Sequence, residues 1–249
     1  MATVVLFSLG GAPGVTTLAL AVAAAWPKPV PTVMVEADAA GGDIAAWRRL
    51  PVSPGLVELA AAARTDAPFA DGAAAPVVLG CSQVLAGGQR VCVAPLLTDS
   101  AAGAVRLLAG HPAVLRADGV VTVVDAGRVA PRTPAASLVA SADTALLVVG
   151  DDLAQLKRAQ GSLPALREAV AHLGLVITGT ATAAGQVHEA LGVPVLQRVP
   201  ADARSAAFLR GHAQPPRPYR RPLMRSARHL AERLAHTTPL TPAEKAGAR

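Results

Sequence analysis

Short runs of apolar, mostly β-branched residues recur along the chain, and alanine-rich stretches of helical length separate them. Continuous apolar runs bounded by Gly, Pro or Asp are typical of strands buried on both faces of a parallel sheet. The longer stretches supply the crossovers that parallel strands need. The runs predict strands at Thr3–Phe7, Pro31–Val35, Val91–Pro95, Val120–Val124, Ala145–Val149, Leu173–Ile177 and Val193–Val199. The pattern therefore predicts an α/β protein with a mostly parallel, doubly wound sheet flanked by helices.

Three further segments complete the expected organisation. Leu56–Arg64 predicts a helix that Ser53 caps or Pro54 starts, and Val77–Leu85 is interpreted as a strand that turns back at Gly87-Gly88. In the final predicted helix, Leu223–Ala235, four apolar residues fall on one face at helical spacing. No repeat or interdomain linker interrupts the chain, so we expect a single domain over residues 1–235 and a disordered tail at 236–249.

The amino-acid composition indicates how the core is built and argues against a membrane-spanning or secreted protein. Hydrophobic residues make up 52% of the chain but aromatic residues only 2%, so Ala, Val and Leu must build the core. The longest apolar run, Thr16–Trp26, is shorter than the roughly 20 residues that span a bilayer, and no basic segment of a signal peptide precedes the first strand. Cys81 and Cys92 lack metal-site spacing and are interpreted as reduced core residues of a cytoplasmic protein, with a disulfide as the alternative.

Positive charge is concentrated near the C-terminus. Residues 1–200 hold 13 Lys and Arg against 14 Asp and Glu, whereas residues 201–249 hold 10 against 3. The net charge of +6 therefore reflects the C-terminal region and not a basic protein throughout.

A glycine-rich loop follows the first predicted strand. Gly10, Gly11 and Gly14 precede a helix that opens on Thr16-Thr17. Glycines allow backbone N–H groups to point at one anion, and a helix N-terminus adds partial positive charge. Thr16 stands where the hydroxyl of a P-loop contacts magnesium. Taken alone, the loop also fits a strand-to-helix turn without a ligand, because it contains no lysine.

Acidic residues follow several predicted strands. Glu36, Asp38 and Asp43 come after the second strand, and Asp125-Ala-Gly127 follows the strand Val120–Val124. The carboxyl ends of parallel strands form the edge where open α/β sheets bind ligands. Glu36 is either functional or a partnered structural acid, and Asp43 either caps a helix through Trp47 or faces a dimer partner. Asp143, just before another strand, is predicted to be structural.

These motifs, with Val199-Pro-Ala-Asp202 near the end, stand in an order that resembles the ParA/MinD family of deviant-Walker P-loop ATPases. The resemblance runs from about Thr3 to Leu234 and is closest to actinobacterial ParA-like and CpaE/TadZ-like proteins. It implies a P-loop NTPase fold of the ParA/MinD type, with ATP and magnesium as ligands.

The resemblance also implies roles for individual residues. Asp38 would position an attacking water, and Asp125 would be the Walker B acid that reaches magnesium through water, while Thr16 binds the metal directly. The remaining nucleotide contacts would come from Gly10, Gly11, Gly14, Val15 and Thr17 at the phosphates, and from Thr178, Pro200 and Asp202 beside the base. Thr178 stands where the family has an asparagine.

The loop departs from the family pattern Gly-Lys-Gly-Gly-x-Gly-Lys-Thr-Thr. Leu9 replaces its first glycine, Gly10 its signature lysine and Val15 its P-loop lysine. A unit charge about 4 Å from a phosphate contributes roughly 1 to 4 kcal/mol, so the loss of both predicts weak binding and little hydrolysis unless another cation substitutes. Arg128 is the candidate substitute, the alternative being a solvated loop arginine. Arg48 and Arg49 either cross a dimer interface or are surface charges.

The expected function is that of a cytoplasmic, homodimeric positioning or partitioning factor, a possible pseudo-ATPase whose partner belongs to a secretion, pilus or division apparatus. Whether it is an enzyme stays open, and a weak ATPase with a substitute arginine is one alternative. The other is a nonspecific DNA-binding partition protein that uses the basic region of Arg217, Arg220, Arg221, Arg225 and Arg228. Membrane contact is not expected, because the apolar stripe of the last helix is thin and lacks aromatic residues.

Overall fold

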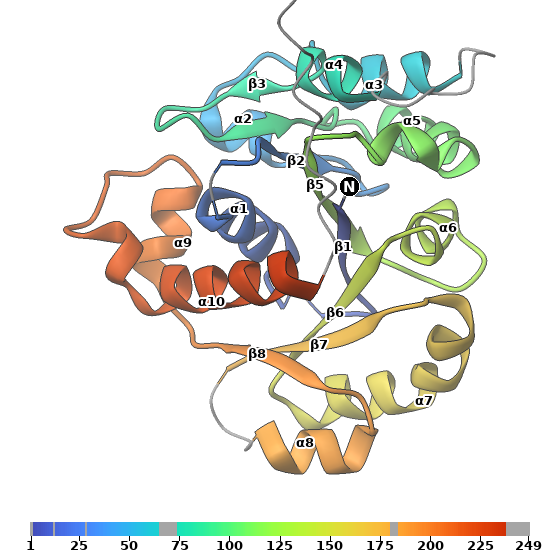
Figure 1. The fold of residues 1–249 in the computed structure, drawn as a ribbon, viewed down its shortest axis with the longest axis vertical. Coiled ribbons are helices and arrows are strands. Elements are labelled where there is room, and N and C mark those ends of the chain that lie inside the picture. Colours follow the sequence, from blue (N-terminus) through green and yellow to red (C-terminus); the bar gives the residue numbers. More distant parts are fainter. Residues whose placement is uncertain (1, 12, 28, 65–73, 180–183, 238–249) are drawn as a thin grey trace, which may run out of the picture.

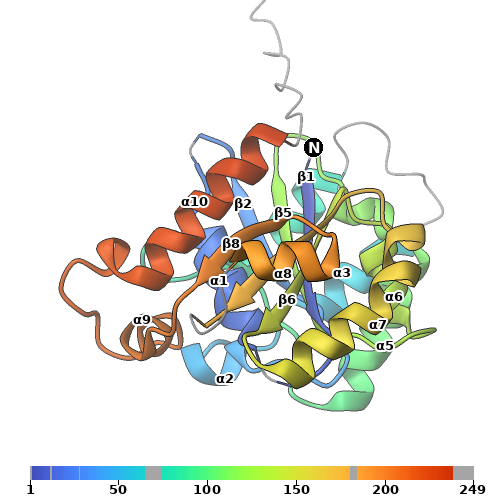
Figure 2. The same cartoon turned by 90° about the horizontal axis from the view of Figure 1, so that it is seen from below.

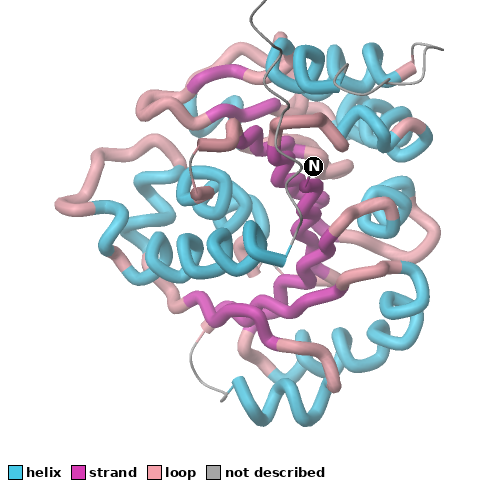
Figure 3. The backbone as a smooth tube through the Cα atoms, viewed as in Figure 1, coloured by secondary structure: helices cyan, strands magenta, loops and turns pink. Residues whose placement is uncertain are grey.

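The computed structural model contains an eight-stranded sheet in the order β3-β4-β2-β5-β1-β6-β7-β8 (Figures 1 and 3). It describes residues 2–11, 13–27, 29–64, 74–179 and 184–237. The strands are β1 Ala2–Ser8, β2 Thr32–Glu36, β3 Gln83–Val84, β4 Arg90–Cys92, β5 Val121–Arg128, β6 Thr144–Gly150, β7 Leu173–Thr178 and β8 Val195–Val199. All neighbouring strands pair in parallel except β3, which is antiparallel to β4. The predicted fold class is confirmed.

Helices cover both faces of the sheet. They are α1 Val15–Ala25, α2 Ile44–Arg48, α3 Leu56–Ala63, α4 Ala74–Gly80, α5 Thr98–Gly110, α6 Pro134–Ala140, α7 Leu153–Ala169, α8 Ala184–Leu191, α9 Ala203–Leu209 and α10 Pro222–Thr237, with 3₁₀ turns η1 Pro112–Leu115 and η2 Pro218–Arg220. Helices α1, α9 and α10 lie on one side of the sheet, and α5, α6 and α7 lie on the other (Figure 1).

The alternation of side chains along β1 explains why two cores form. Val4 and Leu6 pack in the cluster beneath α1 and α10, whereas Val5 and Phe7 pack in the cluster beneath α3 to α7. Successive residues of a strand point to opposite faces, so a strand that is apolar throughout must be covered twice. β1 lies between β5 and β6 and therefore carries its following loop to the middle of the carboxyl edge.

One predicted strand is wrong. Residues 74–80 form helix α4, and only Gln83–Val84 pairs as an edge strand with β4. The β-branched Val77 and Val78 suggested a strand, but Ala74 and Val78 are buried at helical i,i+4 spacing. Pro76 stands in the first turn, where a helix tolerates it.

Helix α10 buries its apolar face within the molecule. Leu223, Ala227, Leu230 and Leu234 are at most 5% exposed and belong to the core that includes α1. Figures 1 and 2 show α10 alongside α1. Within the described residues, no helix combines the length and apolar character needed to cross a bilayer. The tail prediction for residues 236–249 falls almost wholly outside the described residues.

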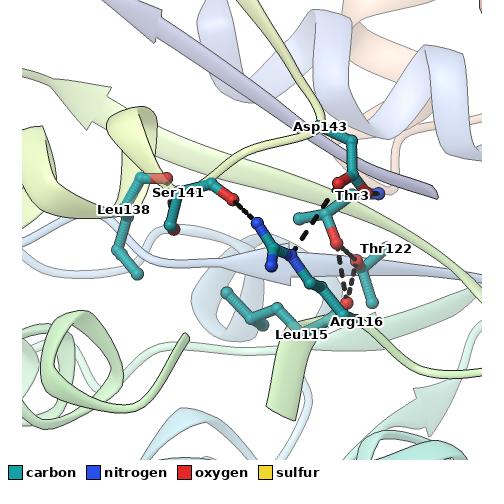
Figure 4. Close-up of polar contacts among 7 residues, drawn as sticks. All are labelled: Thr3, Leu115, Arg116, Thr122, Leu138, Ser141 and Asp143. Carbon is teal, nitrogen blue, oxygen red and sulfur yellow. Dashed lines mark hydrogen bonds and ion pairs between the residues drawn. The ribbon is translucent and has the colours of Figure 1, made fainter. Parts of the chain in front are cut away.

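A polar cluster closes the amino edge of the sheet (Figure 4). The Thr3 N–H donates to Asp143 Oδ2 over 2.8 Å, and the Arg116 guanidinium lies 3.8 Å from the same carboxylate. The hydroxyls of Thr3 and Thr122 both donate to the Leu115 carbonyl. Asp143 thus has a structural role, far from the strand ends that carry the candidate site. Cys81 and Cys92 are buried free thiols, and no disulfide joins them.

Candidate functional site

The loop between β1 and α1 presents a cradle for an anion. Gly14, the N-cap residue of α1, has φ 87° and ψ 37°, a left-handed conformation that favours glycine. Gly11 also has positive φ, and a Cβ at Gly14 would meet no atom within 4 Å. The first N–H groups of an α-helix have no intrahelical partner, so those of α1 are available to a ligand in front of the loop.

The loop itself contributes no cation. Val15 is 5% exposed and packs in the core beneath α1. Gly10 is buried and has no side chain to extend. Neither position at which the resemblance predicts a lysine therefore carries a cation. A bound anion would have to be held by backbone N–H groups of the loop and by residues of neighbouring elements.

Asp125 is a fully buried carboxyl group with one unsatisfied oxygen. Its Oδ1 accepts the Gly127 N–H over 2.9 Å, whereas Oδ2 has no hydrogen-bond partner among the described residues. Burial raises the pKa of Asp125 to about 7, although the Thr16 hydroxyl and the Gly127 N–H act to lower it. Buried polar atoms are almost always paired, so a carboxylate oxygen without a hydrogen-bond partner, next to a threonine hydroxyl, fits the donor set of a metal ion. Oxygen donors of this kind are those that magnesium prefers.

Asp38 lies above the end of β5. Its Oδ1 accepts the Ala40 N–H over 2.8 Å, and its carboxylate is in contact with Gly127, where a Cβ would overlap it. Gly127 has φ 60° and is thus required both for its backbone conformation and for the space that Asp38 fills. Burial raises the pKa of Asp38, with a small further contribution from Asp43.

Glu36 has a structural role. Its Oε1 accepts the N–H groups of Asp43 at 2.8 Å and Ile44 at 3.1 Å, and its Oε2 accepts that of Ala94 at 2.9 Å. The carboxylate joins the end of β2 to the start of α2 and to the segment after β4. Burial raises its pKa, and the three N–H donors oppose that effect. Asp43 is the N-cap residue of α2, as expected, and its carbonyl accepts the Trp47 N–H at 2.9 Å, while its side chain makes no cap hydrogen bond.

The residues expected beside a base already make contacts within the protein. Asp202 caps α9 through Ser205 and accepts hydrogen bonds from Arg221 at 3.1 and 2.7 Å. Burial acts to raise the pKa of Asp202, but these donors outweigh it and bring the pKa to about 2. Thr178 ends β7 with its hydroxyl 3.4 Å from the Val149 carbonyl, and Pro200 follows β8 beside α10. Any contact of this segment with a base must come from atoms other than the Asp202 carboxylate.

The arginines singled out from the sequence have different surroundings. Arg128 is exposed at the end of β5, opposite Ser8 of β1. Arg48 donates to the carbonyls of Phe208 and Leu209 and so stabilises the C-terminus of α9. In the basic C-terminal region Arg221 is paired with Asp202, whereas Arg217, Arg220, Arg225 and Arg228 are exposed.

Sequence reasoning missed two side chains of α7 that contact the loop. Gln155 fills the space in front of Gly11, and Arg158 lies against Gly10. The spacing of Asp152 and Gln155 is a recognisable capping signal for α7, but nothing local to α7 indicates which loop it covers.

A second concavity lies away from the loop. It encloses about 860 Å³ between α2, α9 and η2, and its lining includes Trp47, Arg49, Arg210, His212 and Tyr219. The Arg210 guanidinium stands 4.9 Å from the centre of the Trp47 ring. We call it the Trp47 groove.

Several solved structures have a fold similar to that of this chain. The chain superposes on the cell division ATPase MinD of Pyrococcus furiosus with a TM-score of 0.71 and 17% identity, covering 96% of this chain and 100% of that one. The chain has the ParA/MinD fold. A ParA family ATPase from Chlorobium tepidum TLS gives a TM-score of 0.70 at 15% identity, with 93% and 98% of the two chains covered. The septum site-determining protein MinD of Pyrococcus horikoshii OT3, complexed with Mg-ADP, gives 0.63 at 16%, with 94% and 97% covered.

The likeness to ParA/MinD structures extends over nearly the whole chain. No family model matches the sequence, and no curated protein matches it either. The ParA/MinD fold predicted from the order of motifs is thus confirmed by similarity to solved structures. At these sequence identities, the similarity concerns the fold alone.

Proposed function

We propose that this protein binds an adenine nucleotide with magnesium at the Gly10–Thr17 loop and uses it as a slowly hydrolysed switch. The observation that carries the proposal is the buried Asp125 carboxyl group, which interacts with the Thr16 hydroxyl of α1 and whose Oδ2 has no hydrogen-bond partner among the described residues. An unpaired buried carboxylate costs free energy that a bound cation would recover. A protein of the same fold is complexed with Mg-ADP, which supports this choice of ligand.

Each group at the loop has a defined part in the proposal. N–H groups of Gly11, Gly14 and the first turn of α1 would receive the phosphates, and Thr16 and Asp125 would hold magnesium directly and through water. When bound, magnesium neutralises phosphate charge. The Asp38 carboxylate would hold a water in front of the phosphates. Because neither Gly10 nor Val15 is a lysine, we expect weak affinity and slow turnover.

We further propose that nucleotide controls pairing of two copies of the chain and docking to a secretion, pilus or division apparatus. Support comes from fold neighbours that are named as cell division and septum site-determining proteins. Nonspecific DNA binding through the exposed Arg217, Arg220 and Arg225 is a separate hypothesis. Within the described residues the apolar face of α10 is buried against α1, which favours a polyanion over a membrane as the ligand of this region.

Calorimetric titration of the protein with ATP, with and without magnesium, tests the nucleotide proposal. Heat of binding should require magnesium, and Thr16→Val should weaken binding by roughly tenfold or more, because a magnesium ligand is lost. Thr144→Val, at the opposite edge of the sheet, is the matched control and should bind like the wild type. Absence of binding at millimolar Mg-ATP, or equal affinities of the Thr16 and Thr144 variants, overturns the proposal.

Phosphate release measured on the same proteins tests the slow switch. The wild type should turn over far more slowly than it exchanges nucleotide. Steady multiple turnover that Asp38→Ala abolishes would show instead that the protein is a working ATPase.

A further inference from the structure

The guanidinium of Arg158 lies directly against the loop at Gly10. A Cβ placed on Gly10 would overlap Nη1 of Arg158 and lie 2.9 Å from its Cζ. Gly10 does not have a positive φ, so its backbone conformation does not require glycine. A side chain at position 10 would therefore displace the guanidinium of Arg158 from its place against the loop.

Hydrogen bonds at the start of α7 fix the first turn of the helix that carries Arg158. Asp152 accepts the backbone N–H of Gln155 at 3.0 Å and its side-chain amide at 2.6 Å, and Gln155 Oε1 accepts the Gly150 N–H at 2.8 Å. Arg158 follows Gln155 by three residues, on the same side of the helix. Arg158 and Gln155 line a small niche together with Leu9 and Val149. The end of β6, the loop after β1 and the start of α7 therefore lie against one another at this point.

The charge of Arg158 is not used elsewhere in the described part of the chain. Arg48, Arg198 and Arg221 donate to carbonyls or carboxylates, whereas Arg158 has neither an acceptor nor a carboxylate partner among the described residues. A planar guanidinium with several donors suits phosphate oxygens, and a charged hydrogen bond is about twice as strong as a neutral one.

We infer that Arg158 supplies the positive charge that the loop lacks and contacts the polyphosphate of the bound nucleotide. The inference rests on the nucleotide proposal above, and it replaces Arg128 as the candidate cation. The cradle provides N–H groups, and α7 provides the charge from outside the loop.

Mg-ATP affinity of paired variants tests this assignment. Arg158→Ala should weaken binding about 10- to 100-fold, the range of a charged hydrogen bond, and Arg158→Lys should retain part of it. Lys157→Ala removes the same charge from the next residue of α7, whose ammonium lies 3.2 Å from Gln160, and should stay within about twofold of the wild type. Arg158 is exposed, so the thermal midpoint should not change in either variant.

Substitutions at Gly10 test the same contact from the loop side. Gly10→Ala should displace Arg158 and weaken Mg-ATP to the same degree, and combining it with Arg158→Ala should add no further loss. Gly10→Lys in the Arg158→Ala background should restore affinity by returning a cation to the loop.

The outcomes separate this inference from the nucleotide proposal. If the wild type binds Mg-ATP and Thr16→Val weakens it, but Arg158→Ala does not, only the role of Arg158 is overturned. Fully additive losses from Gly10→Ala and Arg158→Ala also contradict it. A wild type that binds no Mg-ATP overturns both.

Discussion

At the residue scale, Asp125 is a buried carboxyl group of the candidate site whose charge costs stability. Its carboxyl group is inaccessible to solvent, and its pKa is raised from 3.8 to about 7 by burial. The folded protein therefore holds this proton more tightly than the unfolded chain does. The resulting stabilisation is complete below pH 3.8 and is lost as the pH rises through 7.

Replacement of Asp125 by asparagine should stabilise the protein without ligand at pH 8. Asparagine keeps an oxygen for the Gly127 N–H and removes the buried charge, so we expect a gain of about 2 to 4 kcal/mol in the free energy of unfolding. The gain should shrink as the pH is lowered toward 4. Urea unfolding of both proteins without magnesium, at pH 8 and pH 5, measures it; a variant no more stable than the wild type at pH 8 would show that Asp125 is not destabilised by its charge.

At the scale of elements, Glu36 joins three segments that end near the site. Because one carboxylate accepts N–H groups from the start of α2 and from the segment after β4, it sets the path of the loop that carries Asp38. Gly42 lies against the same carboxylate and leaves no space for a side chain.

Glu36→Ala should cost about 3 kcal/mol or more in the free energy of unfolding, because it leaves buried donors without acceptors. Glu58→Ala is the matched control. Glu58 accepts the N–H of Gly55 and the hydroxyl of Ser53 at the start of α3, where water can replace it, and its loss should cost about 1 kcal/mol. Chemical denaturation of the two variants compares them, and similar costs would refute the special role of Glu36.

The sequence predicts those elements whose signals are local. The strand β1, its glycine loop and α1 follow one another, so apolar runs and glycines suffice to predict them, and the acids at the ends of β2 and β5 follow from the parallel topology. The difference between Glu36 and Asp38 depends on N–H donors from the start of α2 and from the segment after β4, which are distant in the chain. The pairings of Arg158 with Gly10 and of Arg221 with Asp202 join segments far apart in the chain, and no local pattern encodes them. For α4, burial of Ala74 and Val78 outweighed β-branched composition.

At the scale of the whole molecule, the candidate site and the basic surface are separate. Glu36, Asp38, Asp125 and the glycine loop lie where β1, β2 and β5 end, while α10, which carries the exposed Arg225 and Arg228, lies with α1 and α9 on one side of the sheet (Figure 1). The Trp47 groove lies between α2, α9 and η2. A ligand at the loop and a polyanion at the basic surface would therefore occupy different parts of the protein.

Amide hydrogen exchange with and without Mg-ATP tests the central claim most directly, because it reports where the nucleotide binds. We predict slower exchange at residues 10–17, with smaller changes at 36–43 and 125–128, and no change in α5 or α6. Arg158→Ala should reduce this protection at equal Mg-ATP concentration. Protection confined to the Trp47 groove, or unchanged exchange throughout, would contradict a nucleotide site at the lysine-free loop.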